Sequence, residues 1–460
     1  MLKRYIGDKV FYRHVLSIAL PIVIQNAITQ FVSLLDNSMG GQVGTIQMSG
    51  VSIVNQLLFI FYLCVFGANA GAGIFTAQFH GHQDSDGVRH TFRYKIIACI
   101  LLALAGCAVL LLGQTPLISL YLQGEGSVED AAGVLHYGKE YLQVMLWGLL
   151  PFALSNAYSS TLRETGQTVV PMVGSIVAVF TNLILNYVLI FGHLGLPAMG
   201  VQGAALATTI SRFVELAIVA GWTHLNGKIC TFIRGVYRSL YIPKKLLGEI
   251  LRKGAPLMVN ECLFATGLAV VNQCYSTCGL EVVPAVNITS TVFSLVSVAY
   301  MSMGNSVGII MGQMLGAGKS EEEVRSANGK LIAISLATGV LFGAVAMLFA
   351  DAFPMLYKTS DQVRELAGDL IVIMALMIPS NAYVHAAYFT LRSGGKTGIT
   401  FLFDCGFMWG LLVPVAFVLS RFTDMPIVPL YLLSQATDII KAFAGALMVK
   451  KGTWIQNLTK

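Results

Sequence analysis

Two stretches of eight residues, Thr161-Leu-Arg-Glu-Thr-Gly-Gln-Thr168 and Thr390-Leu-Arg-Ser-Gly-Gly-Lys-Thr397, share the pattern T-L-R-x-x-G-x-T and lie 229 positions apart. A second pair of motifs, Gln78-x-x-Gly81 and Gln313-x-x-Gly316, recurs at a spacing of 235. Because the two spacings differ by only six residues, one short gap aligns the first half of the chain with the second. The sequence is therefore predicted to contain one hydrophobic unit twice.

The composition indicates a membrane protein. Of the residues, 55% are hydrophobic and 11% are charged, whereas about a quarter are charged in an average soluble domain. A helix needs about 20 residues to cross a hydrocarbon core of about 30 Å. We therefore predict an all-α membrane protein with twelve transmembrane helices: Val15–Asn37, Gln47–Ile74, Ile96–Gly113, Leu142–Ser160, Val169–Phe191, Val201–Trp222, Ala255–Thr277, Val286–Met311, Leu331–Ala350, Leu370–Leu391, Ile399–Leu419 and Ile427–Val449.

Six helices per repeat is an even number, so the second repeat enters the membrane in the same direction as the first. Parallel repeats of this kind occur in secondary transporters, with the substrate site near mid-membrane. We predict an amino-terminal six-helix lobe at residues 1–223, a cytoplasmic inter-lobe loop at 224–253 and a carboxyl-terminal six-helix lobe at 254–460. The two Gln-x-x-Gly motifs are expected to form tight reversals, as gate or structural loops.

The basic residues predict the orientation, because Lys and Arg accumulate on the cytoplasmic side. The termini and the loops after even-numbered helices hold 23 of the 29 Lys and Arg residues. We expect a multi-pass protein of a bacterial plasma membrane with both termini cytoplasmic and the first helix retained. This bias accounts for the net charge of +6, so no nucleic-acid partner is expected.

Motifs of catalysis and metal binding are missing from the sequence. It contains no C-x-x-C pair, no H-E-x-x-H and no G-x-x-x-x-G-K-[ST] motif, which are patterns of structural zinc sites, zinc proteases and ATP-binding loops. We therefore expect neither an enzyme nor an organic cofactor.

The duplicated L-R-x-x-G-x-T, the Gln-x-x-Gly loops, the stretch Gly195–Thr208 and an aspartate in the first helix resemble the multidrug and toxic compound extrusion (MATE) family. The resemblance extends from about His14 to about Lys450. It implies an antiporter that exports small organic, often cationic, compounds in exchange for H⁺ or Na⁺ by rocking two six-helix lobes. A monomer is sufficient for such a mechanism.

The resemblance also implies cation-coupling residues in the first lobe. Asp36 corresponds to the helix-one aspartate that takes the coupling ion. If that ion is Na⁺, it is expected to bind at Asp36. Asn182 and Asn186, four residues apart on one helical face, and Thr208 correspond to its polar partners. A site with one carboxylate and neutral oxygens can bind either H⁺ or Na⁺, so the identity of the coupling ion stays open.

A second coupling site is expected in the carboxyl-terminal lobe. Glu261 resembles the helix-seven glutamate of part of the family, whereas the helix-ten aspartate of some sodium-coupled members is Asn381 here. Asp404 either lines the cavity in place of that acid or takes part in an interhelical hydrogen bond. Charged groups are costly within a bilayer, by about 2.5–3.5 kcal/mol each on insertion scales, so they usually face a cavity.

Two further charge pairs are interpreted as structural. Arg212 with Glu215 and Asp438 with Lys441 are each spaced i, i+3 on a helix. The substrate cavity itself is expected to be lined by aromatic and Met side chains, which accommodate flat hydrophobic cations.

Two alternatives to an antiporter stay open. A lipid-linked saccharide flippase of the same superfamily would need a larger and more basic cavity, which the few basic residues within the predicted spans disfavour. A membrane sensor that transports nothing has no distinguishing motif.

Overall fold

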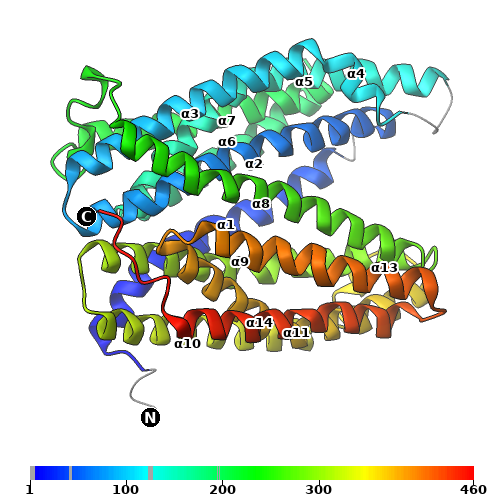
Figure 1. Ribbon diagram of the computed structural model, residues 1–460. Coiled ribbons are helices and arrows are strands. Elements are labelled where there is room, and N and C mark those ends of the chain that lie inside the picture. The colour runs from blue at the N-terminus through cyan, green and yellow to red at the C-terminus, as the bar shows by residue number, and fades with distance from the viewer. Residues whose placement is uncertain (1–5, 41–43, 123–127, 194, 196, 460) are drawn as a thin grey trace. The chain divides into compact units, whose positions relative to one another are not determined.

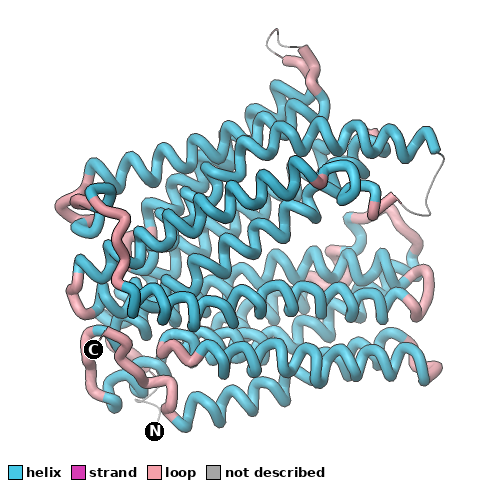
Figure 2. The backbone as a smooth tube through the Cα atoms, turned by 45° about the horizontal axis from the view of Figure 1, so that its top comes forward, coloured by secondary structure: helices cyan, strands magenta, loops and turns pink. Residues whose placement is uncertain are grey.

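The computed structural model describes residues 6–40, 44–122, 128–193, 195 and 197–459, and for residues 33–40 and 128 it describes the backbone alone. Across these residues the regular structure is entirely helical (Figure 1, Figure 2). The predicted all-α fold is confirmed.

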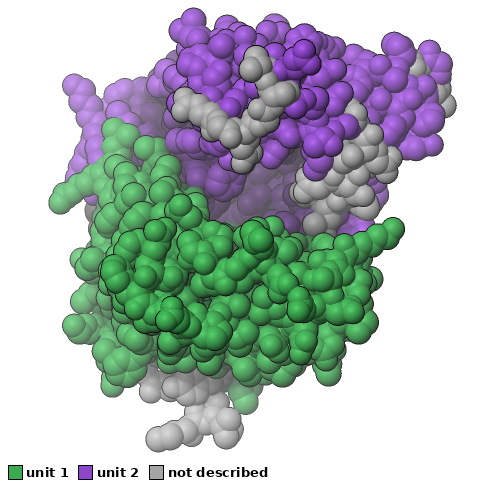
Figure 3. All heavy atoms as spheres, turned by 90° about the vertical axis from the view of Figure 1, so that its right-hand side faces the viewer, with its two compact units in different colours: residues 1–23, 77–84, 251–460 green, residues 24–76, 85–250 purple. Residues whose placement is uncertain are grey.

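The chain divides into two compact units, which Figure 3 shows in different colours. Unit 1 comprises Met1–Val23, Ala77–Asp84 and Leu251–Lys460, and unit 2 comprises Ile24–Thr76 and Ser85–Ile250. Helix α1 (Lys9–Gly40) starts in unit 1 and continues in unit 2, whereas α2 (Thr45–Gly81) runs from unit 2 into unit 1. The lobe boundaries at residues 223 and 253 stay predictions.

Unit 2 is built on helix α7, against which α5 and α6 both pack, and α3 packs against α5. The further elements of this unit are α3 (Ser85–Leu112), α4 (Gln114–Ser119), α5 (Val128–Glu164), α6 (Val169–Phe191), α7 (Gly200–Leu225) and the short 3₁₀ helices η2 (Thr231–Ile233) and η3 (Val236–Arg238). The guanidinium of Arg93 on α3 donates hydrogen bonds to the carbonyls of Gly235, Val236 and Tyr241. These bonds attach the segment after α7 to α3.

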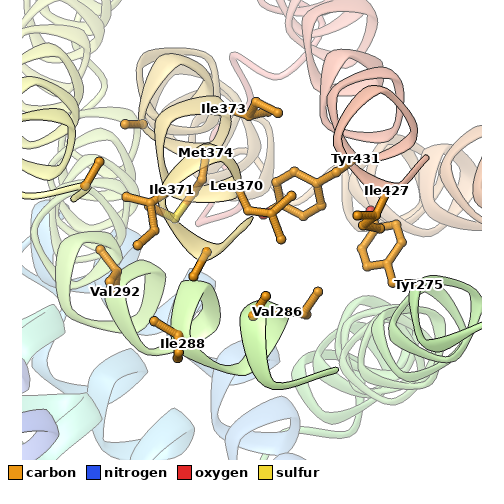
Figure 4. Packing of buried hydrophobic residues seen from close by; sticks show 14 of the residues in the cluster. Tyr275, Val286, Ile288, Val292, Leu370, Ile371, Ile373, Met374, Ile427 and Tyr431 are labelled. Carbon is orange, nitrogen blue, oxygen red and sulfur yellow. The ribbon is translucent and has the colours of Figure 1, made fainter. Parts of the chain in front are cut away.

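Unit 1 is built on helix α11, which packs against α9, α10 and α14. Its further elements are α8 (Lys244–Ser276, which begins in unit 2), α9 (Val282–Gly316), α10 (Glu321–Leu348), η4 (Pro354–Leu356), α11 (Asp361–Ser393), α12 (Thr397–Phe401), η5 (Leu402–Gly406), η6 (Met408–Leu412), α13 (Val413–Phe422) and α14 (Ile427–Lys451). A buried apolar cluster joins α9 and α11 to α14 through side chains such as Val286, Leu370 and Tyr431 (Figure 4). In unit 1, the start of α1 and the end of α14 lie at the same end of the bundle, on the left in Figure 1.

The membrane spans agree with the sequence prediction. Within the described residues, eleven helical segments are long and apolar enough to cross a membrane. The remaining predicted span, Leu142–Ser160, lies in α5, a 37-residue helix that carries polar Gln143, Ser155 and Asn156. The predicted span Ile399–Leu419 is not one regular helix, because η5 and η6 are π-helical turns within it. Such turns are rare and often occur at functional sites.

The duplicated octapeptides form equivalent helix ends. Helix α5 ends at Glu164 and α11 ends at Ser393. The motif glycines Gly166 and Gly395 then take left-handed backbone angles, with φ of +81° and +72°. A glycine in this conformation is a common way to end a helix, which explains why the motif contains Gly twice at the same place.

Candidate functional site

A polar stripe on α5 forms one wall of a cavity inside unit 2. Phe152, Ser155, Asn156, Ser159 and Arg163 all line it. Their spacing of three or four residues places them on one face of the helix. The wall is therefore set by the helical period of the sequence.

Three other helices of unit 2 complete the cavity, which has a volume of about 320 Å³. Each contributes a stripe with the same helical spacing. The remaining lining residues are Gln25, Asn26, Thr29 and Val32 of α1, Ser175, Ala178, Val179 and Asn182 of α6, and Thr208, Ser211, Arg212 and Glu215 of α7. This volume lies within the range of about 300–1,000 Å³ that is usual for small-molecule pockets.

Three of the predicted coupling residues lie together beside this cavity. The Asn186 side chain donates a hydrogen bond of 3.1 Å to Oδ1 of Asn182, which in turn donates one of 3.1 Å to Oγ1 of Thr208. Asn182 and Asn186 are 7% and 4% exposed. The prediction that the two asparagines share a helical face is confirmed, and the chain of amides joins α6 to α7.

Asp36, the proposed coupling acid, lies within the helical range of α1. Its side chain lies outside the described residues. The spacing Gln25, Thr29, Val32, Asp36 continues the stripe of α1 that lines the cavity, by one further turn. Its role stays a prediction.

The charged groups of the cavity contact one another. Arg212 forms the predicted i, i+3 pair with Glu215, at 3.3 Å. Glu215 also accepts a hydrogen bond of 2.7 Å from Ser175, whose hydroxyl accepts one of 2.6 Å from Gln25. The Arg212 guanidinium lies 5.0 Å from the centre of the Phe152 ring, which is a cation–π distance.

Several polar atoms at the cavity have no partner. The Nε atoms of Arg163 and Arg212, the Ser159 hydroxyl and the Gln25 carbonyl oxygen are buried without a hydrogen bond. Ser159 is 4% exposed. Buried polar groups are normally satisfied, because leaving one unpaired costs about 1–3 kcal/mol. Unpaired groups on a cavity wall are available to a ligand.

In unit 1, one candidate residue, Asp404, belongs to the π-helical turn η5. It accepts a hydrogen bond of 2.9 Å from Asn260 of α8. Its other oxygen lies 2.6 Å from the ammonium of Lys441 on α14. Of the two roles considered for Asp404, the structure thus shows the interhelical hydrogen bond.

The remaining candidates of unit 1 do not share these contacts. Glu261 on α8 is partly buried, next to Asn260, and Asn381 is partly buried on α11. Lys441 forms an ion pair with Asp404, and its charge also acts on its predicted partner Asp438. The contact with Asp404 was not predicted, because sequence spacing on one helix does not report a carboxylate supplied by a neighbouring element.

The expected aromatic and Met lining is also not found in this cavity. Of its described lining residues, one is aromatic, Phe152, and none is Met. The methionines Met303, Met311 and Met374 instead fill the apolar clusters of unit 1. The reason is that the cavity lies between the polar stripes of four helices.

Sequence reasoning also missed Arg163 and Ser159. The predicted spans leave Arg163 in the cytoplasmic loop between Ser160 and Val169, whereas the structure places it on α5 at the cavity. The signal was present as the polar series Ser155, Asn156, Ser159, Arg163, which has helical spacing.

A helical chain with many membrane spans, a duplicated sequence and a polar cavity is typical of the class of multi-pass membrane transporters. The MatE family model matches the chain in two stretches, residues 21–188 and 256–418, which begin at Pro21 and Pro256. The chain therefore belongs to the MatE family.

Relatives and solved structures agree with this assignment. The chain is 26% identical to a probable multidrug resistance protein NorM of Thermotoga maritima, over 96% of this chain and 93% of the relative. It is 25% identical to the probable multidrug resistance protein YoeA of Bacillus subtilis, over 94% and 91%. The fold matches the bent form of the Vibrio cholerae MATE transporter VcmN with a TM-score of 0.84 at 19% identity, covering 96% and 97% of the chains.

A second similar structure is a MOP superfamily transporter from Pyrococcus furiosus, with a TM-score of 0.83 at 18% identity, covering 99% and 98% of the chains. For that transporter, the reverse polarity of its binding pocket is described as suggesting a different function. At this identity the likeness shows the fold alone.

Proposed function

We propose that this protein is a multidrug efflux transporter, a secondary active antiporter that exports organic compounds in exchange for H⁺ or Na⁺ by alternating access. The names of the relatives as probable multidrug resistance proteins support an exporter. The observation that carries the proposal is the polar cavity of unit 2, where the hydrogen-bonded series from Asn186 through Asn182 to Thr208 lies beside a space for a small molecule.

The coupling ion binds at Asp36 in this proposal. A carboxylate within a membrane is costly in its ionised form, so protonation or a bound Na⁺ changes which state of the transporter is favoured. Asn182, Asn186 and Thr208, which are joined by hydrogen bonds on α6 and α7, supply neutral oxygens for the ion in this proposal. In unit 1, the carboxylates of Glu261 and Asp404, with Asn381, form a second site that responds to the first.

The driving force is sufficient to export a neutral substrate. One positive charge that moves inward gains about 2.3 kcal/mol per 100 mV, and about 1.4 kcal/mol supports a tenfold concentration ratio. The transporter works in the plasma membrane with both termini cytoplasmic, as a monomer whose two six-helix lobes move about the loop at 224–253.

The test is transport by the purified protein in proteoliposomes. Vesicles loaded with a fluorescent organic compound receive either a pH gradient or a Na⁺ gradient, each at a clamped membrane potential. Efflux that one gradient accelerates and the other does not supports the antiporter and identifies its ion. Efflux that neither gradient changes contradicts the proposal, and no flux of any solute favours a sensor without transport.

One observation favours the flippase alternative. Two arginines, Arg163 and Arg212, line the cavity of unit 2, and a lipid-linked saccharide carries a diphosphate that guanidinium groups bind well. A flippase would move a fluorescent polyprenyl-diphosphate sugar between leaflets without an ion gradient. The same vesicles distinguish the two activities.

A further inference from the structure

We propose that the cavity of unit 2 binds an anionic group of the transported molecule, a carboxylate, sulfonate or phosphate, and that Arg163 and Arg212 are its ligands. This inference rests on the proposed function, because it takes the cavity to be the substrate site. It differs from that proposal in the substrate class, which is an organic anion and not an organic cation.

The aromatic ring and the carboxylate of the described lining, which would attract an organic cation most strongly, are already occupied by the protein, and the unpaired carbonyl oxygen of Gln25 is the remaining acceptor. Phe152 is the one aromatic residue among the described lining residues, and the guanidinium of Arg212 lies over its ring at 5.0 Å. Glu215 is the one described carboxylate of the lining, and it is bound by Arg212 at 3.3 Å and by the Ser175 hydroxyl at 2.7 Å. An incoming cation would have to displace these contacts.

The features that would bind an anion are free. The Nε donors of Arg163 and Arg212 are buried without a partner, and so is the Ser159 hydroxyl, which is 4% exposed. Arg163 and Ser159 lie one turn apart on α5, and both line the cavity. Two guanidinium groups and one carboxylate also leave the described lining with one excess positive charge.

Arginine is well suited to this role. Its planar guanidinium binds carboxylate and phosphate with two parallel hydrogen bonds, and it stays charged when buried. A hydrogen bond to a charged group contributes about 1.5–3 kcal/mol. Since about 1.4 kcal/mol corresponds to a factor of ten, loss of either arginine should weaken binding of an anion by more than about tenfold.

The test uses three probes of one shape: 2-naphthoate, 2-naphthamide and 2-naphthamidine, which are anionic, neutral and cationic. Their binding to the full-length protein in a neutral detergent is measured by calorimetry. We expect naphthoate to bind at least about tenfold more tightly than naphthamide, with naphthamidine weakest. Equal binding of all three probes, or tightest binding of naphthamidine, overturns the proposal.

Variants assign the effect to the cavity. Arg163→Gln and Arg212→Gln should each weaken the binding of naphthoate more than about tenfold. The affinity for naphthamide should stay within about twofold of that of the unmodified protein. Glu215→Gln should increase the affinity for naphthoate, because it removes the carboxylate that pairs with Arg212. Arg364→Gln is the matched control, because this arginine pairs with the exposed Asp361 in unit 1. Naphthoate binding that is unchanged in both cavity variants overturns the proposal.

Arg163→Lys keeps the charge without the planar fork and should weaken naphthoate less than Arg163→Gln. If the cavity variants do not fold, as checked by thermal melting, the ranking of the three probes on the unmodified protein decides alone. Displacement of naphthoate by phosphatidylglycerol but not by phosphatidylcholine supports the anion site and assigns it to a lipid headgroup. Displacement by soluble carboxylates alone assigns it to a free organic anion.

Binding and flux separate this inference from the proposed function. Gradient-driven efflux of organic cations without naphthoate binding leaves the antiporter standing and overturns the anion site. Naphthoate binding without any ion-coupled flux supports the anion site and contradicts the antiporter.

Discussion

The side chain of Gln78, at the end of α2, accepts a hydrogen bond of 2.7 Å from the backbone N–H of Leu458, 380 positions later in the chain. Its Nε2 donates hydrogen bonds to the carbonyls of Ser393 (2.9 Å) and Gln456 (3.1 Å). Gln78 is fully buried, and so is nearby Trp454, which is 1% exposed. A single glutamine thus joins the ends of α2 and α11 to the carboxyl-terminal segment.

Replacing Gln78 should destabilise unit 1. Gln78→Ala removes the partner of three backbone groups, of which the Ser393 carbonyl is buried and the other two are partly buried, and an unsatisfied buried group costs about 1–3 kcal/mol. We expect a lower melting temperature in detergent and faster proteolysis of the carboxyl-terminal segment. The control is Gln362→Ala on exposed α11 surface. Equal melting temperatures of the two variants would show that these hydrogen bonds contribute little.

The repeated Gln-x-x-Gly motifs cross each other within unit 1. A Cβ atom added to Gly316 would overlap the carbonyl oxygen of Gln78, and one added to Gly81 would overlap the carbonyl oxygen of Gln313. Gly316→Ala is therefore expected to lower stability strongly, since backbone atoms have to move. Gly398→Ala is the matched control, because open space surrounds that position. Thermal melting compares the two, and a tolerated Gly316→Ala would contradict the close approach.

The pair of Lys441 and Asp404 gives a third prediction. Removing one partner of a buried ion pair leaves the other charge uncompensated, at a cost of about 3–5 kcal/mol. Lys441→Met should therefore destabilise the protein, and Lys441→Met combined with Asp404→Asn should recover part of the loss. Asp361→Asn, at an exposed pair with Arg364, should change stability little. Additive effects of the two single changes would show that Lys441 and Asp404 are not coupled.

Burial raises the pKa of the Cys230 thiol, in the segment after α7, to about 11. At pH 8 about one thousandth of this thiol is then ionised, so a variant with Cys230 as its sole cysteine should react with iodoacetamide at least about a hundredfold more slowly than one with Ser239→Cys. Because the folded pKa exceeds the usual value, near 8.5, this group favours the folded state fully below pH 8.5 and less as the pH rises above it. Rapid labelling at pH 8 would contradict the burial of Cys230.

The sequence predicted the helices because apolar length and duplicated motifs are local properties of the chain. Gly166 and Gly395 were recognisable as a repeat before their left-handed conformation was known. The amide series of Asn182 and Asn186 followed from a spacing of four on one helix. The pairing of Lys441 with Asp404 did not follow, since it depends on which helices pack together and on the π-helical turn that carries Asp404. Arg163 was missed because the end of α5 lies beyond the apolar window.

The most direct test of ion exchange lets the substrate gradient drive the movement of the ion. Proteoliposomes with equal pH and equal Na⁺ on both sides are loaded with substrate, and the movement of H⁺ or Na⁺ is followed with a dye as the substrate leaves. We expect inward movement of one of these ions in proportion to substrate efflux, and loss of both movements in a normally folded Asp36→Asn variant. Substrate efflux without ion movement, or an Asp36→Asn variant that exchanges at the parental rate, would contradict it.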